Sequence, residues 1–172
     1  MIIFENNYEI KENTVITLGK FDGLHEGHRK LIEITVNEAK SRGYKSLLYT
    51  FNQNPVEVLY GKEVKQLISK EEKIREIEKM GIDYLVFQEF TEAFSEKTPE
   101  DFIDDVIKDK LKAKLIVVGF NYKFGRDAKG DIVLLRKYAV EKDFEIEVIE
   151  PVKKNGKIIS SSEIRKELER CI

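Results

Sequence analysis

The residues best suited to chemistry begin with the two histidines of the sequence, His25 and His28, which lie in GKFDGLHEGH at residues 19–28. If a helix begins near Gly27, His28 falls in its first turn, where unpaired backbone N–H groups and the helix dipole favour a phosphate. Gly27 would also let a nucleotide approach the backbone closely. The two imidazoles can then donate hydrogen bonds to the same phosphate oxygens.

Two other interpretations of this histidine pair remain open. Both side chains could be ordinary residues at a helix start, one of them making a capping contact. A zinc site is disfavoured, because two histidines with one nearby glutamate and no cysteine make a poor ligand set. The sequence contains neither the P-loop pattern nor G-x-G-x-x-G, so kinase-type and dinucleotide-binding interpretations lack their basic motif.

A second polar segment, GFNYKFGRDAKGD at residues 119–131, mixes three aromatic side chains with three cations and three glycines. A long loop of this composition can stack on a planar ring and attract an anionic group. The competing interpretation is a solvated connection whose aromatic rings lie against the core.

A third segment, ISSSEIR at residues 159–165, places three hydroxyls at a helix start and Arg165 one turn later. Serines are common helix caps, so a purely structural role is the simpler interpretation of the hydroxyls. The functional interpretation is an anion site, in which N–H and O–H donors and the forked guanidinium bind a phosphate.

The elements that must position these segments alternate between short apolar runs and longer helical patterns. Strands are expected at residues 14–18, 46–51, 82–87, 115–119 and 144–149. Helices are expected at residues 29–42, 69–81, after 99, at 132–139 and near 164–168. This alternation predicts an α/β domain with a mainly parallel sheet flanked by helices. Working groups in such sheets gather beyond the carboxyl ends of the strands, which here means after Gly19, Phe51, Gly119 and Ile159.

Several local patterns sharpen these boundaries. Ser69, with Glu72 three residues later, predicts a capping box. Thr98-Pro99 predicts a helix cap followed by proline at the first helical position. The run at 115–119 is apolar throughout and is expected to be central in the sheet. Asn155-Gly156 predicts a tight turn.

Composition limits the function classes. The 172 residues correspond to one domain, and 30 basic against 32 acidic residues give a net charge of −2, which disfavours a general nucleic-acid coating protein. The single cysteine, Cys171, excludes an intrachain disulfide and a cysteine-based zinc cluster. No signal-type start or membrane-length apolar run is present, so a cytoplasmic protein with no membrane partner is expected.

In this order and spacing, the segments resemble the FMN adenylyltransferase (FAD synthetase) module of bacterial bifunctional riboflavin kinase/FMN adenylyltransferases. The first segment is similar to the H-x-G-H signature of the nucleotidylyltransferase superfamily. The segments that carry the resemblance are GKFDGLHEGH at 19–28, TFNQNP at 50–55, FTEAFSEKTPEDF at 90–102, VVGFNYKFGRDAKGD at 117–131 and ISSSEIR at 159–165.

The resemblance implies one Rossmann-like domain over residues 1–172 that joins ATP and FMN into FAD and releases pyrophosphate. Mg²⁺ is expected to be held mainly by the substrate phosphates, with no metal ligand assigned to the protein. Bifunctional relatives continue into a riboflavin kinase domain, which is not expected within these residues, so a separate riboflavin kinase is a possible partner.

The site residues follow from the same resemblance. His25 and His28 match the paired histidines that contact the nucleotide phosphates. The expected catalytic residues are His25, His28, Asn121, Ser161 and Arg165. The expected ATP-binding residues are Gly19, Lys20, Phe21, Gly27, Gly119, Asn121, Ser160, Ser161, Ser162 and Arg165. The expected FMN-binding residues are Phe51, Asn54, Pro55, Phe124, Gly125 and Arg126.

The expected chemistry needs no serine or cysteine nucleophile, because the FMN phosphate is already an anionic nucleophile. Positioning and fixed positive charge should therefore dominate, and Arg126, Lys123 or Lys129 could attract that phosphate. Two alternatives remain. One is a related nucleotidylyltransferase that uses another phosphorylated acceptor, and the other is a non-catalytic flavin- or nucleotide-binding module.

Overall fold

The computed structural model describes residues 1–170, so Cys171 and the expectations based on it lie outside the described residues. The core is a six-stranded sheet in the order β1-β4-β3-β2-β5-β6, with every neighbouring pair parallel. This confirms the predicted α/β class. The strands are β1 (Ile2–Glu5), β2 (Thr14–Leu18), β3 (Lys45–Phe51), β4 (Tyr84–Gln88), β5 (Ala113–Gly119) and β6 (Glu145–Ile149).

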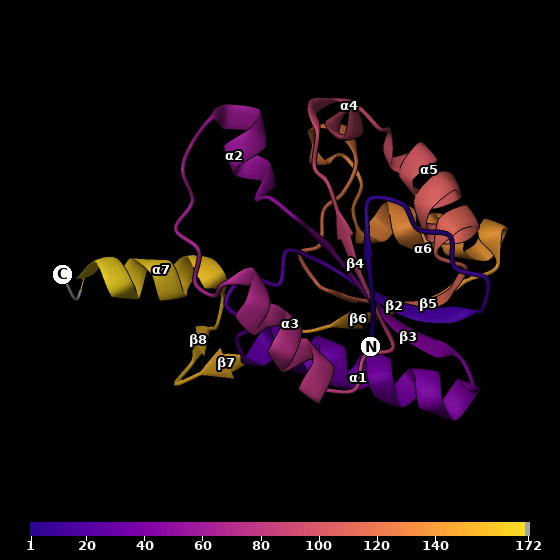
Figure 1. Ribbon diagram of the computed structural model, residues 1–172, viewed down its shortest axis with the longest axis horizontal. Coiled ribbons are helices and arrows are strands. Elements are labelled where there is room, and N and C mark those ends of the chain that lie inside the picture. The colour runs from indigo at the N-terminus through magenta and orange to yellow at the C-terminus, as the bar shows by residue number, and fades with distance from the viewer. Residues whose placement is uncertain (171–172) are drawn as a thin grey trace.

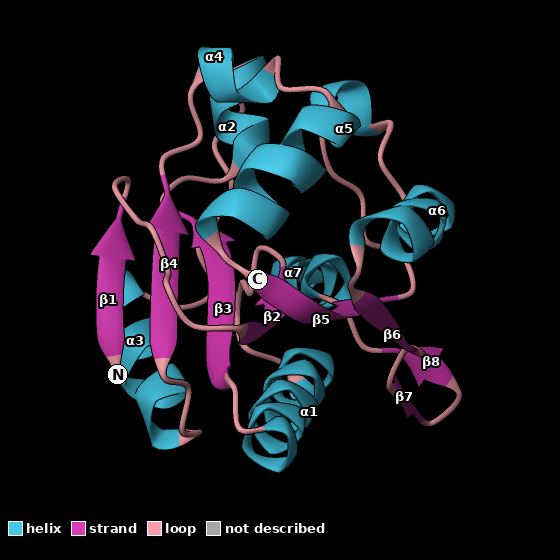
Figure 2. Cartoon of the chain, turned by 90° about the vertical axis from the view of Figure 1, so that its right-hand side faces the viewer, coloured by secondary structure: helices cyan, strands magenta, loops and turns pink. Residues whose placement is uncertain are grey.

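Helices connect the strands and cover the sheet (Figures 1 and 2). The helices are α1 (Glu26–Arg42), α2 (Pro55–Tyr60), α3 (Lys70–Lys79), α4 (Glu92–Ser95), α5 (Pro99–Asp101), the π-helix η1 (Phe102–Lys110), the 3₁₀-helix η2 (Arg126–Ala128), α6 (Ile132–Lys142) and α7 (Ser161–Arg170). A small antiparallel hairpin, β7 (Lys153–Lys154) and β8 (Lys157–Ile158), turns at Asn155-Gly156 as predicted and precedes α7.

The sheet separates two apolar cores. Because side chains alternate along a strand, Val15 of β2 joins the core formed with α1 and α3, whereas Ile16 joins the core formed with η1 and α6. The apolar stripe predicted after Pro99 is buried at every position, namely Phe102, Ile103, Val106, Ile107 and Leu111. The segment that carries this stripe is wound as a π-helix rather than as an α-helix.

The predicted helix starts are also present. Ser69 and Glu72 form the capping box of α3, and Thr98 caps α5 with Pro99 at its first position. The helix predicted at 29–42 begins at Glu26 instead, because the imidazole of His25 caps it. The strand expected at 82–87 is displaced to Tyr84–Gln88.

The elements that were not predicted include the edge strand β1 and the helices α2 and α4. The edge strand β1 pairs with β4, and Ile2 lies opposite Tyr84. Helix α2 follows Asn54, whose side-chain oxygen accepts the backbone N–H of Val56, and has Pro55 at its first position. Helix α4 is a single turn capped by Thr91. All three are short, so hydrophobic periodicity has few residues on which to act.

The strand order places a topological switch point between β2 and β5. From β2 the chain builds outward through β3 and β4, then returns to add β5 and β6 on the other side of β2. Ligand crevices in open α/β sheets lie at such points, beyond the carboxyl ends of the strands. Within residues 1–170, no helix is both long and apolar enough to cross a bilayer.

We expect Ser69→Ala to lower the free energy of unfolding by about 1 kcal/mol, because it removes the hydroxyl that accepts the Glu72 N–H at the start of α3. Urea unfolding followed by circular dichroism measures this change. Ser69→Thr is the control, since it keeps a capping hydroxyl. A stability unchanged by Ser69→Ala would contradict a stabilising role for the capping box.

Candidate active site

A cleft of about 1060 Å³ opens at the carboxyl ends of β2, β3 and β5, at the switch point. Its volume lies at the upper end of the usual range for ligand pockets, roughly 300–1,000 Å³. Every residue expected to bind ATP or FMN lines this cleft, namely Gly19, Lys20, Phe21, His25, Gly27, His28, Phe51, Asn54, Pro55, Gly119, Asn121, Phe124, Gly125, Arg126, Ser160, Ser161, Ser162 and Arg165.

His25 has a defined role at the start of α1. Its Nδ1 accepts the backbone N–H groups of Gly27, at 3.1 Å, and His28, at 3.4 Å. A neutral imidazole that accepts through Nδ1 carries its proton on Nε2. The capping contact considered in the sequence analysis is therefore present, and it fixes an Nε2–H donor beside the helix start.

The glycine between the histidines makes this arrangement possible. A Cβ atom on Gly27 would lie 2.9 Å from Cε1 of His25 and 3.1 Å from its Nδ1. Besides the nucleotide approach expected from the sequence, Gly27 has a structural role, because it leaves room for the ring of His25. With that space free, the imidazoles of His25 and His28 stack, with ring centroids 3.7 Å apart.

Both imidazoles are neutral near pH 7. Burial lowers the pKa of His25, and burial together with the charges of His25 and Lys73 lowers the pKa of His28 to about 3. The ring of His28 also lies against Phe21, which is fully buried, at 5.2 Å between centroids. The histidines therefore offer this cleft hydrogen bonds rather than full positive charges.

The loop between β2 and α1 is held in a costly conformation. Phe21 and Leu24 have positive φ angles of 49° and 43°, a region that side chains with a Cβ rarely adopt. The carbonyl of Lys20 accepts hydrogen bonds from Thr50 Oγ1 at 3.0 Å and from Lys73 Nζ at 3.3 Å. These contacts from β3 and α3 hold the loop in place.

Asp22 joins this loop to the start of α7. Its carboxylate pairs with the guanidinium of Arg165, and its backbone carbonyl accepts the hydroxyl of Ser161. Arg165 Nε also donates to the carbonyl of Lys65 at 3.0 Å. The predicted serine-arginine wall therefore lies directly against the predicted histidine loop.

The three serines differ in their contacts. Ser160 Oγ accepts the N–H of Glu163 at 3.2 Å, which is the capping role that the sequence analysis gave as the simpler interpretation. Ser161 donates to Asp22, and Ser162 is exposed to solvent. Ser162 and the remaining N–H groups of Arg165 are thus the donors at this end of the cleft with the fewest protein partners.

The loop at 119–131 is ordered by its own contacts. Phe124 and Gly130 exchange two backbone hydrogen bonds, and the Arg126 N–H donates to the carbonyl of Lys97. Gly125 is required here, because it has a φ of 76° and a Cβ would lie 2.8 Å from Pro99. Phe124 is buried, so its ring supports the loop from within the core.

Two aromatic residues that were not assigned from the sequence, Phe90 and Phe94, join the predicted Phe51 on the β3 side of the cleft. Phe51 makes edge contacts with Phe90 and Phe94 at 5.1 and 5.7 Å between centroids. Leu59 and Tyr60 of α2 also line the cleft and are exposed. The F-x-x-x-F spacing of Phe90 and Phe94 and the cap at Asn54 were the available sequence signals.

Comparison with known proteins identifies the family. Residues 7–163 match the model of the family described as FAD synthetase. The chain belongs to the FAD synthetase family. Relatives include the bifunctional riboflavin kinase/FMN adenylyltransferases of Buchnera aphidicola (subsp. Acyrthosiphon pisum), 35% identical over 95% of this chain, and Escherichia coli K12, 32% identical over 92%. These alignments cover 52% and 51% of the relatives, so the chain spans about half their length.

Solved structures agree with the fold of a FAD synthetase. A Streptococcus pneumoniae structure described as a macrolide-efflux protein superimposes with a TM-score of 0.85 and 27% identity, covering 96% of this chain and 57% of that one. The pantoate-beta-alanine ligase of Francisella tularensis superimposes with a TM-score of 0.60 and 18% identity, covering 96% and 73%. The second match supports the Rossmann-like architecture alone.

We expect His28 to remain neutral from pH 8 to pH 5, because burial holds its pKa near 3. NMR titration of the imidazole signals measures this directly, and an inflection near pH 6.5 would contradict it. Since the folded pKa lies below the usual value of about 6.5, the unfolded chain binds more protons between these two pH values. Stability should therefore fall as the pH drops below about 6.5, by at most about 1.4 kcal/mol per pH unit from this group.

Gly27→Ala should displace the His25 ring from its stacked position, because the added Cβ would lie 2.9 Å from Cε1 of that ring. NMR measures this change, since the imidazole signals of His25 and His28 lose the ring-current shift that stacking produces. Loss of the His25 cap and the higher helix propensity of alanine act on stability in opposite directions, so the free energy of unfolding should change by less than about 1 kcal/mol. Unchanged imidazole signals would show that the stacked position tolerates a Cβ at residue 27.

Proposed function

We propose that the protein is an FMN adenylyltransferase, which transfers AMP from ATP to FMN and yields FAD and pyrophosphate. The proposal rests on one observation, which is that the histidine loop and the serine-arginine wall meet at Asp22 at the mouth of a single cleft. Hydroxyl, imidazole N–H and guanidinium donors converge there, as the binding of a polyphosphate requires.

The switch-point end of the cleft is suited to binding ATP, which donates the AMP group. Arg165 has five N–H donors, and its contacts to Asp22 and Lys65 leave others for phosphate oxygens. Ser162 and the first N–H groups of α7 add neutral donors beside it. Gly119 and Asn121, at the end of β5, line the same cleft.

The aromatic side of the same cleft is suited to binding FMN, which accepts the AMP group. Phe51, Phe90 and Phe94 form an apolar wall at the end of β3, and Tyr60 and Leu59 extend from α2 above it. A flat, polycyclic acceptor can bury its surface against such rings. This wall favours FMN over acceptors that lack a planar ring.

The chemical step depends on positioning the two substrates and needs no nucleophile from the protein. A phosphate oxygen of FMN bonds to the α-phosphorus of ATP, the bond from that phosphorus to the bridging oxygen of the β-phosphate breaks, and pyrophosphate leaves with the electron pair. Nε2–H of His25 and the adjacent imidazole of His28 donate to the phosphate oxygens as negative charge develops. Because the rings are stacked and capped in place, little reorganisation is needed.

Mg²⁺ enters this proposal as part of the substrate, bound to ATP phosphates. Within residues 1–170, no group of three or more His, Cys, Asp or Glu side chains is placed to hold a metal ion.

The test is incubation of the chain with ATP, Mg²⁺ and FMN, with the product identified by mass. FAD and pyrophosphate are the expected products. A panel of other phosphorylated acceptors, including pantetheine phosphate, nicotinate mononucleotide and glycerol phosphate, distinguishes the alternatives. Product from one of these but not from FMN would make the protein a different nucleotidylyltransferase, and ATP binding without any product would make it a binding module.

His28→Ala should reduce kcat for FAD formation by about 10²–10³-fold, as expected when a group that stabilises developing charge is lost. Arg29→Ala is the matched control, because Arg29 is the next residue of α1 but is exposed and pairs with Glu76 outside the cleft. Circular dichroism establishes that both variants are folded. Wild-type kcat in the folded His28→Ala protein would remove this residue from the mechanism.

A further inference from the structure

The proposed reaction brings two anions together, yet three cations that line the cleft, Lys97, Arg126 and Arg165, already pair with carboxylates. Among the described residues, Lys20 and Lys123 are the other lysines and arginines that line it. The two imidazoles are neutral, and Arg165 is paired with Asp22. Arg126 is exposed and lies near Glu96, at 3.4 Å. Lys129, which the sequence analysis also considered for the FMN phosphate, does not line the cleft.

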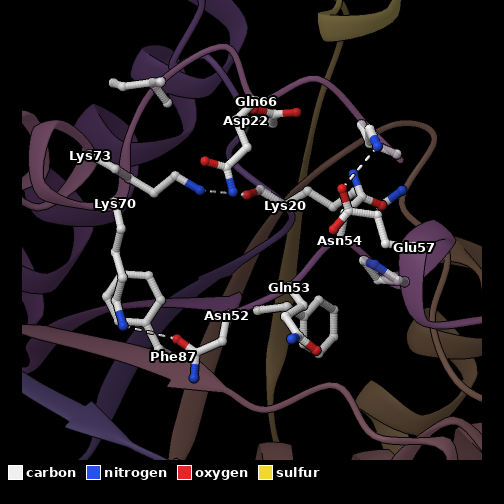
Figure 3. Close-up of a pocket in the computed structure, with 14 residues that line it drawn as sticks. Lys20, Asp22, Asn52, Gln53, Asn54, Glu57, Gln66, Lys70, Lys73 and Phe87 are labelled. Atoms are coloured by element: carbon white, nitrogen blue, oxygen red, sulfur yellow. Dashed lines mark hydrogen bonds between the residues drawn. The ribbon is translucent and has the colours of Figure 1, made fainter. Parts of the chain in front are cut away.

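A small side pocket of about 70 Å³ adjoins the cleft between the ends of β3 and β4 and the start of α3 (Figure 3). The two spaces share five lining residues, namely Lys20, Asp22, Phe51, Asn54 and Pro55. Lys70 and Lys73 of α3 line the side pocket as well. The pocket therefore brings three ammonium groups to the edge of the aromatic wall.

The lysines of α3 differ in how they are partnered. Lys70 Nζ pairs with Glu5 at 2.6 Å, donates to Asn52 at 3.1 Å, and lies over the ring of Phe87. Lys73 is half-buried and extends across the pocket toward Lys20, whose backbone carbonyl at 3.3 Å is the one polar contact of its ammonium within residues 1–170 (Figure 3). An ammonium with a single neutral acceptor has unused donors. The two carboxylates that line the same pocket are already engaged, because Asp22 pairs with Arg165 and Glu57 accepts the backbone N–H of Val64.

The surroundings of Lys73 disfavour the charged form of its ammonium. Burial lowers the pKa of Lys73 to about 8, and its charge contributes to the lowered pKa of His28. Lys73 reaches the same β2–α1 loop as the histidines, because it donates to the carbonyl of Lys20, the residue before Phe21, and the Phe21 ring lies against His28. An incoming phosphate would supply the missing negative charge.

We propose that Lys73, with Lys20 beside it, binds the phosphate of the acceptor and holds it next to the histidine pair for attack on ATP. This assignment rests on the proposed function and adds the residue that recognises the nucleophile. It places the flavin ring on the aromatic wall and its phosphate at the side pocket, which Phe51 and Pro55 connect.

The test compares binding of FMN and riboflavin, which differ by the phosphate alone. Fluorescence quenching gives both Kd values for the wild-type chain and for Lys73→Met, Lys20→Met and Lys70→Met. We expect Lys73→Met to weaken FMN binding by about 10- to 100-fold, the range for a lost charge-assisted hydrogen bond. Riboflavin binding should change less than about twofold, and Lys70→Met, whose ammonium is held by Glu5, should keep the wild-type preference.

Three results would overturn the inference. Equal weakening of both flavins would show that Lys73 acts through the fold alone. Weaker ATP binding with an unchanged FMN preference would assign the lysine to the donor phosphates. A wild-type chain that binds both flavins equally would show that the phosphate is not recognised. If Lys73→Met does not fold, Lys20→Met and the charge-conserving Lys73→Arg, which should retain the preference for FMN, decide between these results.

Failure of the proposed function would be seen separately. The wild-type chain would then form no FAD from ATP and FMN, whatever the variants bind. A wild-type chain that forms FAD, combined with a Lys73→Met variant that keeps its full preference for FMN, would overturn this inference alone.

Discussion

The site depends on one interaction, the hydrogen bonds that the first turn of α1 donates to the imidazole of His25. Nδ1 of the ring takes the role that serine or aspartate fills at most helix starts, so the proton is confined to Nε2. The same contact holds the ring flat against His28, in space that only a glycine at position 27 leaves free. The start of α1 and the placement of the proposed phosphate donors therefore depend on the same hydrogen bonds.

Asp22 provides the second constraint, because it ties two distant parts of the chain, α7 and the segment before α3, to that helix start. Its side chain contacts Arg165 of α7 and accepts the backbone N–H of Leu67, while its carbonyl accepts the hydroxyl of Ser161. An acid beside a polyphosphate site would weaken anion binding if it had no cation of its own. The carboxylate of Asp22 pairs with the guanidinium of Arg165 and orients it. Arg165 keeps further N–H donors for an anion, although Asp22 neutralises part of its charge.

Much of this was predictable from the sequence. Alternating apolar runs gave the parallel sheet, and the carboxyl-end rule led to the loops after Gly19, Phe51, Gly119 and Ile159, which meet in one cleft. Family membership was also predicted correctly from the order of the motifs. These predictions were correct because they need only local sequence patterns and a general rule of sheet topology.

The remaining features depend on tertiary contacts that no local pattern encodes. The role of Gly27 in making room for the ring of His25, two positions earlier, was not predicted. Lys73 belongs to a charged run typical of a solvated helix face, yet it is half-buried because α3 packs beside the β2–α1 loop. The aromatic wall joins Phe51, the last residue of β3, to Phe90 and Phe94, which follow β4.

The contact between Ser161 and Asp22 joins residues 139 positions apart in the chain, whereas the sheet and its two cores are complete by β6. Because the folded sheet already fixes both Asp22 and the end of β6, docking of α7 closes only the segment between Ile149 and Ser161, at a small cost in conformational entropy. The serine-arginine wall should therefore form after the sheet, against a loop that the sheet has already positioned.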